Sequence, residues 1–296
     1  MTAAVTNELT SPPVSPRPPS APWLRWLKRR WTVIAVLTIL TVVLIGYVVG
    51  PMIATARKSV AADRALDGGF SFDAWHDFWT SPAQVNAIGG SLLVSALTVV
   101  LAGVLGSALA ILLTRWEFPG RAICHVLVLL PIALPPLMGV WAFKLLFGIG
   151  GRIPFAMQTW FGIPQNSLWL KGMAGVLIVH TMTMYPYFYL TVRAAALNAD
   201  VSMEEAAESL GASRLRVWLT VLLPMLTPAF VAAGLLTFMS SMSSYTAPLL
   251  FQYTDVMTQQ IVIAKVSGDL RLASVVSTVL AVLSILFLAI IRNYES

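Results

Sequence analysis

The chain has 296 residues, of which 57% are hydrophobic and only 11% are charged. Soluble domains carry about 25% charged residues, so this composition excludes an ordinary water-soluble enzyme and favours a protein embedded in lipid. The net charge of +6 is better explained by basic residues on one side of a membrane than by binding to nucleic acid. We therefore expect no nucleic-acid partner. The single cysteine, Cys124, forms no intrachain disulfide, and no Cys/His spacing typical of a metal site is present.

Residues 1–22 are rich in Pro, Ser and Thr and contain few large apolar side chains. Such a segment buries too little apolar surface to order itself, so we expect a disordered cytoplasmic tail. The first membrane span and an outer loop are expected to occupy residues 23–86. The apolar run of the first span is longer than the core of about 7–15 residues found in secretion signals, which favours a permanent span.

Six stretches are long and apolar enough to cross a bilayer, because a helix needs about 20 apolar residues to do so. They are residues 31–49, 87–114, 122–147, 173–192, 225–250 and 273–291. The sequence therefore predicts an all-α membrane protein with six transmembrane helices. Most Lys and Arg residues outside the spans fall on the side of the N-terminus, including a basic cluster just before the first span. This bias predicts that both termini are cytoplasmic.

One cytoplasmic loop, about residues 193–224, is longer than the others. Ser202 and Glu205 have the spacing of a capping box, in which each side chain bonds a free backbone N–H at the helix start. Gly211 lies where a left-handed residue ends a helix, and Ser213 is placed to begin another. The loop is therefore predicted to form a short helix, a glycine turn and a second helix that stops at the proline closing the loop.

The small side chains of Ala206 and Ala207 allow close approach by another surface. A short helix with a small-residue face and an acidic start suits insertion into a groove on a partner protein. A well-capped loop that only covers the membrane interface is an equally acceptable interpretation of these residues alone.

The same loop resembles the signature of the permease subunits of binding-protein-dependent ABC importers. The family pattern is Glu-Ala-Ala, three residues, Gly, nine residues, Ile, one residue, Leu-Pro. The matching residues are Glu205, Ala206, Ala207, Gly211, Leu223 and Pro224. Only Val221 departs from the pattern, where the family has Ile. The resemblance covers about residues 87–292, the five-helix core of the type I importer permease fold, and leaves the first span outside.

The resemblance implies a multi-pass permease of the bacterial inner membrane. The segment from Glu205 to Gly211 would be a coupling helix that docks on a cytoplasmic ATPase, and an outer solute-binding protein would deliver the substrate. The implied partners are ATPase subunits, that binding protein, membrane lipid and a second permease half, which is an identical chain, a paralogue or a fused second half. The sequence has no G-x-x-x-x-G-K-[ST] phosphate loop, so we expect no enzyme activity and no cofactor here, with ATP bound by the partner.

Subfamily features suggest a substrate class. The stretches 129–136 and 244–250 resemble iron(III) and aminoethylphosphonate permeases, and Leu210 before the glycine is the form shared by iron(III), polyamine, phosphonate, thiamine, sulfate and molybdate permeases. The expected substrate is therefore iron(III), a phosphonate or a polyamine-like small solute. Lys144 is expected to snorkel to the outer interface, with attraction of an anionic substrate as the alternative.

Several residues within the spans are candidates to line the substrate pathway. They are Pro135, Pro136, His180, Ser240, Ser244 and Tyr245. Pro131, Pro135 and Pro136 lack backbone N–H groups and are predicted to kink the third span, which a bilayer tolerates only where protein or a watery cavity bonds the freed carbonyls. Hydroxyls and imidazoles inside a span line polar paths or join helices. For the serines the residues alone favour bonding between helices over lining the pathway. For His180 they favour a buried, neutral side chain that is hydrogen-bonded to a neighbouring helix.

Two other function classes remain as alternatives. A secondary transporter normally needs carboxylates within its spans, and none of the six stretches contains Asp or Glu. An intramembrane enzyme is disfavoured because neither an H-E-x-x-H metal motif nor a G-x-S-x-G nucleophile motif is present. Dependence of transport on ATP and on a separate ATPase separates the importer from both.

Overall fold

The computed structural model describes residues 22–62, 69–148, 150–164 and 170–295. The tail predicted for residues 1–22 therefore lies almost wholly outside the described residues. The chain divides into two compact units, Met1–Ala54 and Thr55–Ser296. The first unit contains α1 (Pro22–Leu44), the π-helical turn η1 (Ile45–Val49) and the start of α2 (Gly50–Ser59). Its apolar side chains from residue 31 to 49 are exposed, as expected of a helix that faces lipid or another helix.

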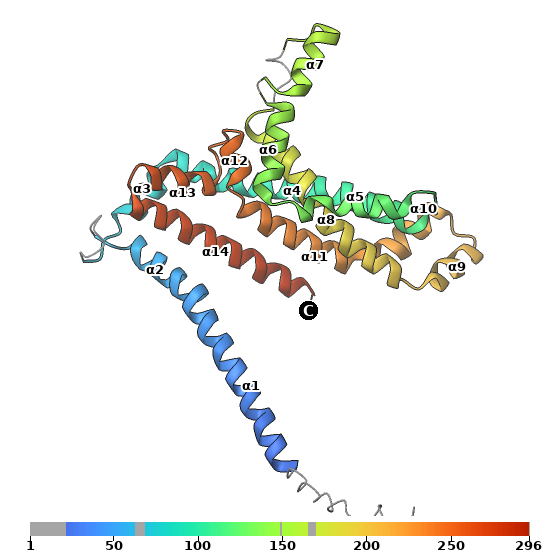
Figure 1. The fold of residues 1–296 in the computed structure, drawn as a ribbon, viewed down its shortest axis with the longest axis horizontal. Helices are drawn as coiled ribbons and strands as arrows, with labels where there is room; N and C mark the ends of the chain where they lie inside the picture. The colour runs from blue at the N-terminus through green and yellow to red at the C-terminus, as the bar shows by residue number, and fades with distance from the viewer. Residues whose placement is uncertain (1–21, 63–68, 149, 165–169, 296) are drawn as a thin grey trace, which may run out of the picture. The chain divides into compact units, whose positions relative to one another are not determined.

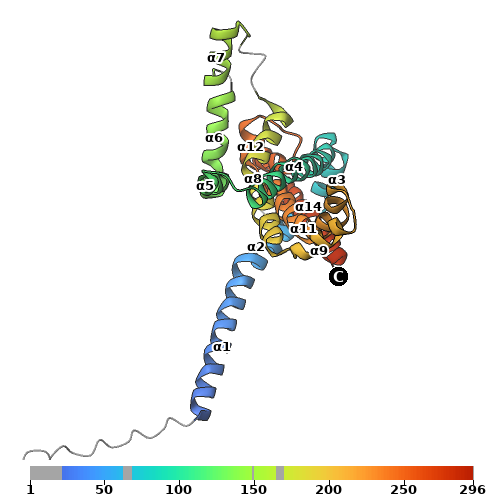
Figure 2. The same cartoon turned by 90° about the vertical axis from the view of Figure 1, so that its right-hand side faces the viewer.

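The second unit is a bundle of helices, shown in Figure 1 and, turned, in Figure 2. Its elements are α3 (Asp73–Thr80), α4 (Pro82–Arg115), α5 (Arg121–Ala133), α6 (Pro136–Phe147), α7 (Arg152–Phe161), α8 (Gly172–Asn198), α9 (Val201–Ser209), α10 (Arg214–Val217), the π-helical turn η3 (Trp218–Leu222), α11 (Leu223–Met242), α12 (Thr246–Leu250), α13 (Met257–Val266) and α14 (Leu270–Glu295). The prediction of an all-α membrane protein is thereby confirmed.

Five helical stretches of the described chain are long and apolar enough to cross a bilayer. They are Arg30–Ser59, Pro82–Arg115, Pro136–Phe161, Arg214–Met242 and Leu270–Ala289. The predicted first, second and sixth spans coincide with three of them. The predicted third and fifth spans differ in their bounds, and the fourth corresponds to α8, which is long but less apolar.

The third span was predicted as one helix with a kink at its prolines, whereas the structure divides it into two helices. Helix α5 ends at Ala133, and the next residue, Leu134, is extended. Helix α6 begins at Pro136 and turns away from α5 (Figures 1 and 2). Two consecutive prolines lack backbone N–H groups, and the first also disfavours a helical conformation for the residue before it. The span is therefore interrupted in its middle.

The fifth span begins earlier and ends earlier than predicted. The stretch Arg214–Met242 is helical throughout, and the N–H of Leu223 bonds the carbonyl of Trp218, five residues back. This wider turn carries the helix past Pro224, which lies in the first turn of α11 and does not end the second loop helix as predicted. At its other end the helix stops at Met242, and α12 follows after a short break.

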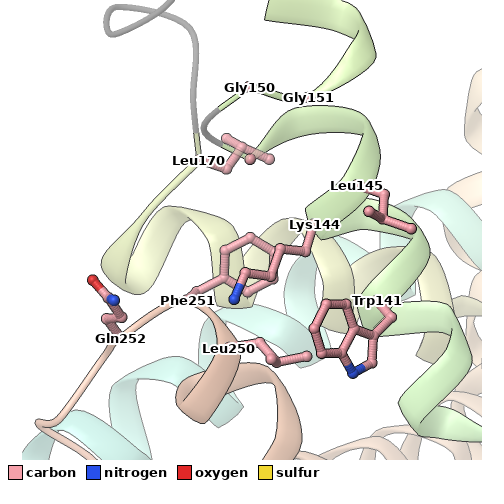
Figure 3. Close-up of a pocket in the computed structure, with 10 residues that line it drawn as sticks. Trp141, Lys144, Leu145, Gly150, Gly151, Leu170, Leu250, Phe251 and Gln252 are labelled. Atoms are coloured by element: carbon pink, nitrogen blue, oxygen red, sulfur yellow. The ribbon is translucent and has the colours of Figure 1, made fainter.

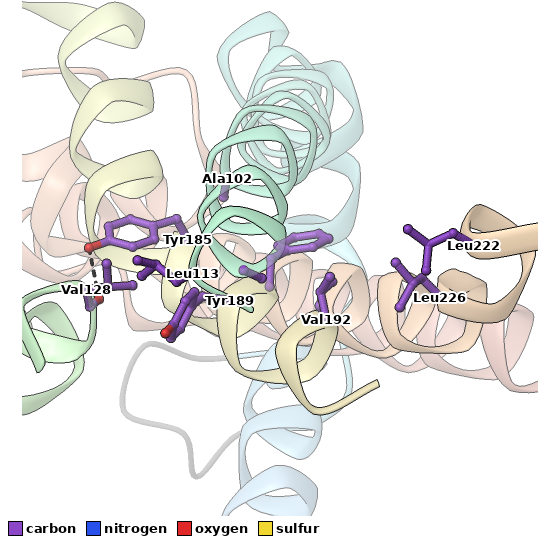
Figure 4. Close-up of a cluster of buried hydrophobic side chains, with 11 residues drawn as sticks. Ala102, Leu113, Val128, Tyr185, Tyr189, Val192, Leu222 and Leu226 are labelled. Atoms are coloured by element: carbon purple, nitrogen blue, oxygen red, sulfur yellow. Dashed lines mark hydrogen bonds between the residues drawn. The ribbon is translucent and has the colours of Figure 1, made fainter. Parts of the chain in front are cut away.

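Helix α8 lies at the centre of the second unit, packed against α4, α5 and α11. It is less apolar than its neighbours because it carries Thr, His and Tyr residues, which find partners inside the protein. A Cβ atom at Gly106 would lie 2.3 Å from the backbone oxygen of Tyr185, so α4 approaches α8 as closely as glycine permits. Figure 4 shows the adjoining core, where Tyr185 donates a hydrogen bond to the Val128 carbonyl of α5 at 2.9 Å.

Candidate functional site

Helix α9 forms the first part of the loop that carries the family signature. Its N-cap is Asp200, whose carboxylate accepts a hydrogen bond from the backbone N–H of Ser202 at 2.9 Å. The capping box predicted for Ser202 and Glu205 is therefore wrong: the acidic residue two positions earlier takes the capping role. Hydrogen bonds from Ser202 hold the pKa of Asp200 below its usual value, which keeps a negative charge at the positive end of the helix dipole.

The predicted end of α9 is confirmed. Gly211 has a φ of 82°, a left-handed conformation that side chains with a Cβ adopt only with strain. The N–H of Ala212 bonds the carbonyl of Ala207 at 3.1 Å, which closes the last turn. The Ser213 hydroxyl then accepts a bond from the Arg216 N–H at 3.4 Å and begins α10, as predicted.

The outward surface of α9 consists of signature residues and their neighbours. Exposed positions are Glu205, Ala206, Glu208, Leu210 and Gly211, while Ala207 is half-buried. Leu210 is 89% exposed, which is unusual for a large apolar side chain at a turn. Its apolar surface is therefore left uncovered by the rest of the protein. Leu223 and Pro224 lie apart from this surface, half-buried and exposed respectively, at the start of α11.

Glu204, on α9, points the other way. Its carboxylate accepts two hydrogen bonds from the guanidinium of Arg115, the last residue of α4, at 2.9 and 2.5 Å. The Glu204 side chain is 15% exposed and that of Arg115 39%. This paired geometry is the strongest arrangement of an arginine and a carboxylate.

A second polar cluster lies inside the bundle. The two ring nitrogens of His180 lie 3.1 Å from Ser241 Oγ and 3.0 Å from Ser244 Oγ, and Ser241 lies 3.2 Å from Ser95 Oγ on α4. His180 is 2% exposed. The structure thus brings together two of the predicted pathway residues, His180 and Ser244, in an arrangement that joins three helices.

The remaining predicted pathway residues lie elsewhere. Pro135 and Pro136 line a pocket of about 430 Å³ between α5, α6 and α8, together with Thr183 and Tyr187. Ser240 is half-buried, and Tyr245 is 55% exposed at the break between α11 and α12. Neither of these two residues lines this pocket.

A smaller pocket of about 320 Å³ lies near the start of α8, at the opposite end of that helix from α9. Figure 3 shows the Lys144 side chain of α6 extending toward Phe251, which follows α12; Trp141 of α6 and Gln252 also line this pocket. The Lys144 ammonium lies 5.3 Å from the centre of the Trp141 ring, within cation–π range. Lys144 is the only ionisable side chain among the described residues that line this pocket.

Sequence reasoning missed Arg115 and Ser95 as members of these clusters. Arg115 was used only in the distribution of Lys and Arg that predicts the membrane orientation, because nothing in the sequence links it to a residue 89 positions away. A serine in an apolar run gives no sign of its partner helix. The only available signal was that Arg115 and Glu204 were predicted on the same side of the membrane.

Comparison with known proteins places this geometry in context. Residues 102–294 match the family model described as binding-protein-dependent transport system inner membrane component. The sulfate transport system permease protein CysT of Salmonella typhimurium strain LT2 is 31% identical over 232 residues, which are 75% of this chain and 82% of the relative.

Two further relatives carry other substrates in their names. The molybdenum transport system permease protein ModB of Escherichia coli strain K12 is 32% identical over 161 residues, 54% of this chain and 69% of the relative. The ferric transport system permease protein FbpB of Actinobacillus pleuropneumoniae is 28% identical over 205 residues, 68% of this chain and 30% of the relative. These relatives do not single out the predicted iron(III) and phosphonate subgroup.

A solved structure shares the fold. The chain matches one from a crystal structure of a bacterial ABC transporter involved in the import of the acidic polysaccharide alginate, with a TM-score of 0.73. The match covers 92% of this chain and 97% of the other, at 15% identity. At this identity the likeness shows the fold alone.

Proposed function

Because the chain belongs to the family of binding-protein-dependent transport system inner membrane components, we propose that it forms half of an importer's substrate pathway and couples to a cytoplasmic ATPase through α9. It is a permease subunit of the ABC importer class. The observation that carries the coupling assignment is the exposed helix α9, capped at both ends by local residues and bearing Glu205 and Ala206 on its outward surface.

Two properties of α9 favour docking: its preformed shape and the small loss of conformational entropy on binding. A helix that is already capped loses little conformational freedom when it docks, so more of the contact energy remains for binding. The exposed Leu210 supplies an apolar contact, and Ala206 lets a partner approach the backbone. Such a surface suits a groove on another protein.

The proposed assembly follows from the single copy of the signature. One copy supplies one docking helix, so a second permease half, identical or homologous, completes the pathway. An outer binding protein delivers the substrate. The proposed orientation places α9 and both termini in the cytoplasm of a bacterial inner membrane.

For the substrate we propose a small inorganic oxyanion. Two of the relatives compared are sulfate and molybdenum permeases, and the match to the sulfate permease covers most of both chains. Lys144 in the pocket near the start of α8 has no carboxylate beside it among the described lining residues, so its charge favours an anion over a cation. The ferric relative favours iron(III) as the second candidate.

Coupling is tested by co-purifying the tagged chain with its ATPase, identified by a phosphate-loop motif. Wild type should retain the ATPase, and Glu205→Lys should lose it because the substitution reverses a charge on the docking surface. Glu117→Lys is the matched control: its side chain is 93% exposed in the loop after α4, and its ion pair with Arg121 at 3.7 Å lies on the surface.

Two results would contradict the coupling proposal. One is full ATPase retention by Glu205→Lys, with the control behaving identically. The other is solute uptake by the purified chain without ATP or any ATPase, which would favour a secondary transporter. Product formation from a substrate within the membrane would favour the enzyme alternative.

The substrate is tested by uptake into proteoliposomes that contain the whole transporter, with labelled sulfate, molybdate and iron(III). Sulfate or molybdate uptake that needs ATP and the binding protein is expected, with Lys144→Gln slowing it and Lys144→Arg preserving it. Uptake of iron(III) alone would overturn the oxyanion proposal. Equal uptake by the Gln variant, with lower lipid phosphate bound, would assign Lys144 to the membrane surface.

A further inference from the structure

The ion pair between Arg115 and Glu204 joins the proposed docking helix to the longest helix of the bundle. Arg115 ends α4, and Glu204 lies in the first turn of α9. Both pairs of donor and acceptor atoms are within hydrogen-bond distance, at 2.9 and 2.5 Å. Two parallel bonds resist both sliding and rotation, whereas a single bond resists only separation.

Helix α9 has few other links to the bundle. It contacts α10 and η3, and the chain connects it to α8 through Ala199 and to α10 through the turn at Gly211. Within the described residues, no other hydrogen bond or ion pair between side chains joins α9 to a membrane-spanning helix. Force applied to α9 therefore has one direct side-chain route to α4.

Helix α4 is able to carry such a force to the far end of the bundle. It has 34 residues, which at 1.5 Å each span the membrane as one continuous rod. It lies close against α8 at Gly106. Farther along, Ser95 bonds Ser241 on α11 at 3.2 Å, and Gln84 donates to Gln260 on α13 at 3.0 Å.

We infer that the pair of Arg115 and Glu204 is the strut that transmits movement of α9 to α4, so that docking and transport are linked through it. The inference rests on the proposed function, in which an ATPase moves α9. Glu204 is then a positioning residue that faces the bundle, while Glu205 faces the partner. The partial burial of the Glu204 carboxylate keeps the pair less screened by salt than a surface pair.

The test uses the assembled transporter with its ATPase and binding protein in proteoliposomes. Variants are Arg115→Glu, Glu204→Arg, the double exchange of the two, and the milder Arg115→Gln in case a reversed charge prevents folding. The control is Glu117→Arg, which breaks an ion pair near the same end of α4 but not one to α9. Three quantities are measured: ATPase bound per permease, ATP hydrolysed, and substrate taken up per ATP.

Arg115→Glu and Glu204→Arg should each bind the ATPase as wild type does, yet take up about tenfold less substrate per ATP, as expected when one charge-assisted pair is lost. The double exchange should restore most of the uptake, because it rebuilds an ion pair at the same place. Arg115→Gln should fall between wild type and the reversals, and Glu117→Arg should match wild type.

Three results would overturn the inference. Normal uptake per ATP in all single variants would show that the strut is not needed. Loss of ATPase binding by Glu204→Arg, not regained in the double exchange, would make Glu204 part of the docking surface. If wild type itself binds no ATPase, the proposed function is wrong and this inference falls with it. The wild-type measurement distinguishes that outcome from the other two.

Discussion

The Nε2 atom of His180 lies 3.0 Å from Ser244 Oγ and so ties α8 to the break between α11 and α12. Its other nitrogen lies 3.1 Å from Ser241 Oγ, on the last turn of α11. A neutral imidazole offers one donor and one acceptor, which matches two hydroxyl partners. The histidine therefore holds the chain on both sides of the break, next to the exposed Tyr245.

Replacing His180 by Leu should destabilise the protein, because the half-buried Ser244 hydroxyl loses its imidazole partner and the buried Ser241 hydroxyl keeps only Ser95. The expected cost is about 2 kcal/mol, or a fall of about 5 °C in Tm for a unit of this size. Gln is the matched control, since its amide offers both a donor and an acceptor. Thermal unfolding in detergent checks both variants, and equal Tm values for Leu and wild type would contradict the bridging role.

Gly106→Ala should disrupt the packing of α4 on α8. Its new Cβ would lie 2.3 Å from the Tyr185 carbonyl oxygen and 2.7 Å from the Phe188 Cβ, so the helices must separate at a cost of about 1–3 kcal/mol. Gly89→Ala in the same helix is the control, because no atom lies within 4 Å of its Cβ. We expect a lower Tm for Gly106→Ala but not for Gly89→Ala. Similar Tm values for the two variants would mean that α4 and α8 separate without cost.

Gly211→Val should weaken ATPase association several-fold while leaving the bundle folded. The left-handed conformation at this turn, with a φ of 82°, disfavours a β-branched residue, whereas Asn tolerates it. Co-purification of the Val and Asn variants with the ATPase measures the difference. If both variants bind as wild type does, the turn does not shape the docking surface.

Ser209 and Thr254 should lie on opposite sides of the membrane. Ser209 ends α9, beyond the end of α8, while Thr254 lies between α12 and α13. Thr254 follows shortly after Phe251, whose carbonyl accepts a hydrogen bond from the N–H of Gly172 at the start of α8. After Cys124, the sole cysteine, is replaced by Ala, a cysteine is placed at either position. A membrane-impermeant thiol reagent added outside intact cells should label Thr254→Cys alone, and labelling of Ser209→Cys instead would reverse the proposed orientation.

The sequence was sufficient for the class of fold because span length and composition depend on the bilayer alone. It was also sufficient for the turn at Gly211, since that conformation is set by one residue. A kink in the third span was predicted from its prolines, but the complete break at Pro135 and Pro136 was not. Prolines are common in membrane helices, and whether they bend or break one depends on what surrounds the freed carbonyls.

The start of α9 shows a different limit. Asp200 and Ser202 are both good N-caps, and the sequence does not decide which residue leaves the preceding helix first. The partners of His180, Arg115 and Ser95 were out of reach for another reason. Each contact joins helices whose register is fixed only when the whole bundle packs, so no local pattern predicts it.

The way α9 is bounded makes it a transferable cassette. Its start depends on Asp200 and its end on Gly211, both within the segment, and only Glu204 makes a side-chain bond or ion pair to a membrane-spanning helix among the described residues. Grafting residues 200–213 from another permease should therefore change which ATPase is recruited without redesign of the membrane portion. The graft needs one condition: an acidic residue at the position that meets Arg115.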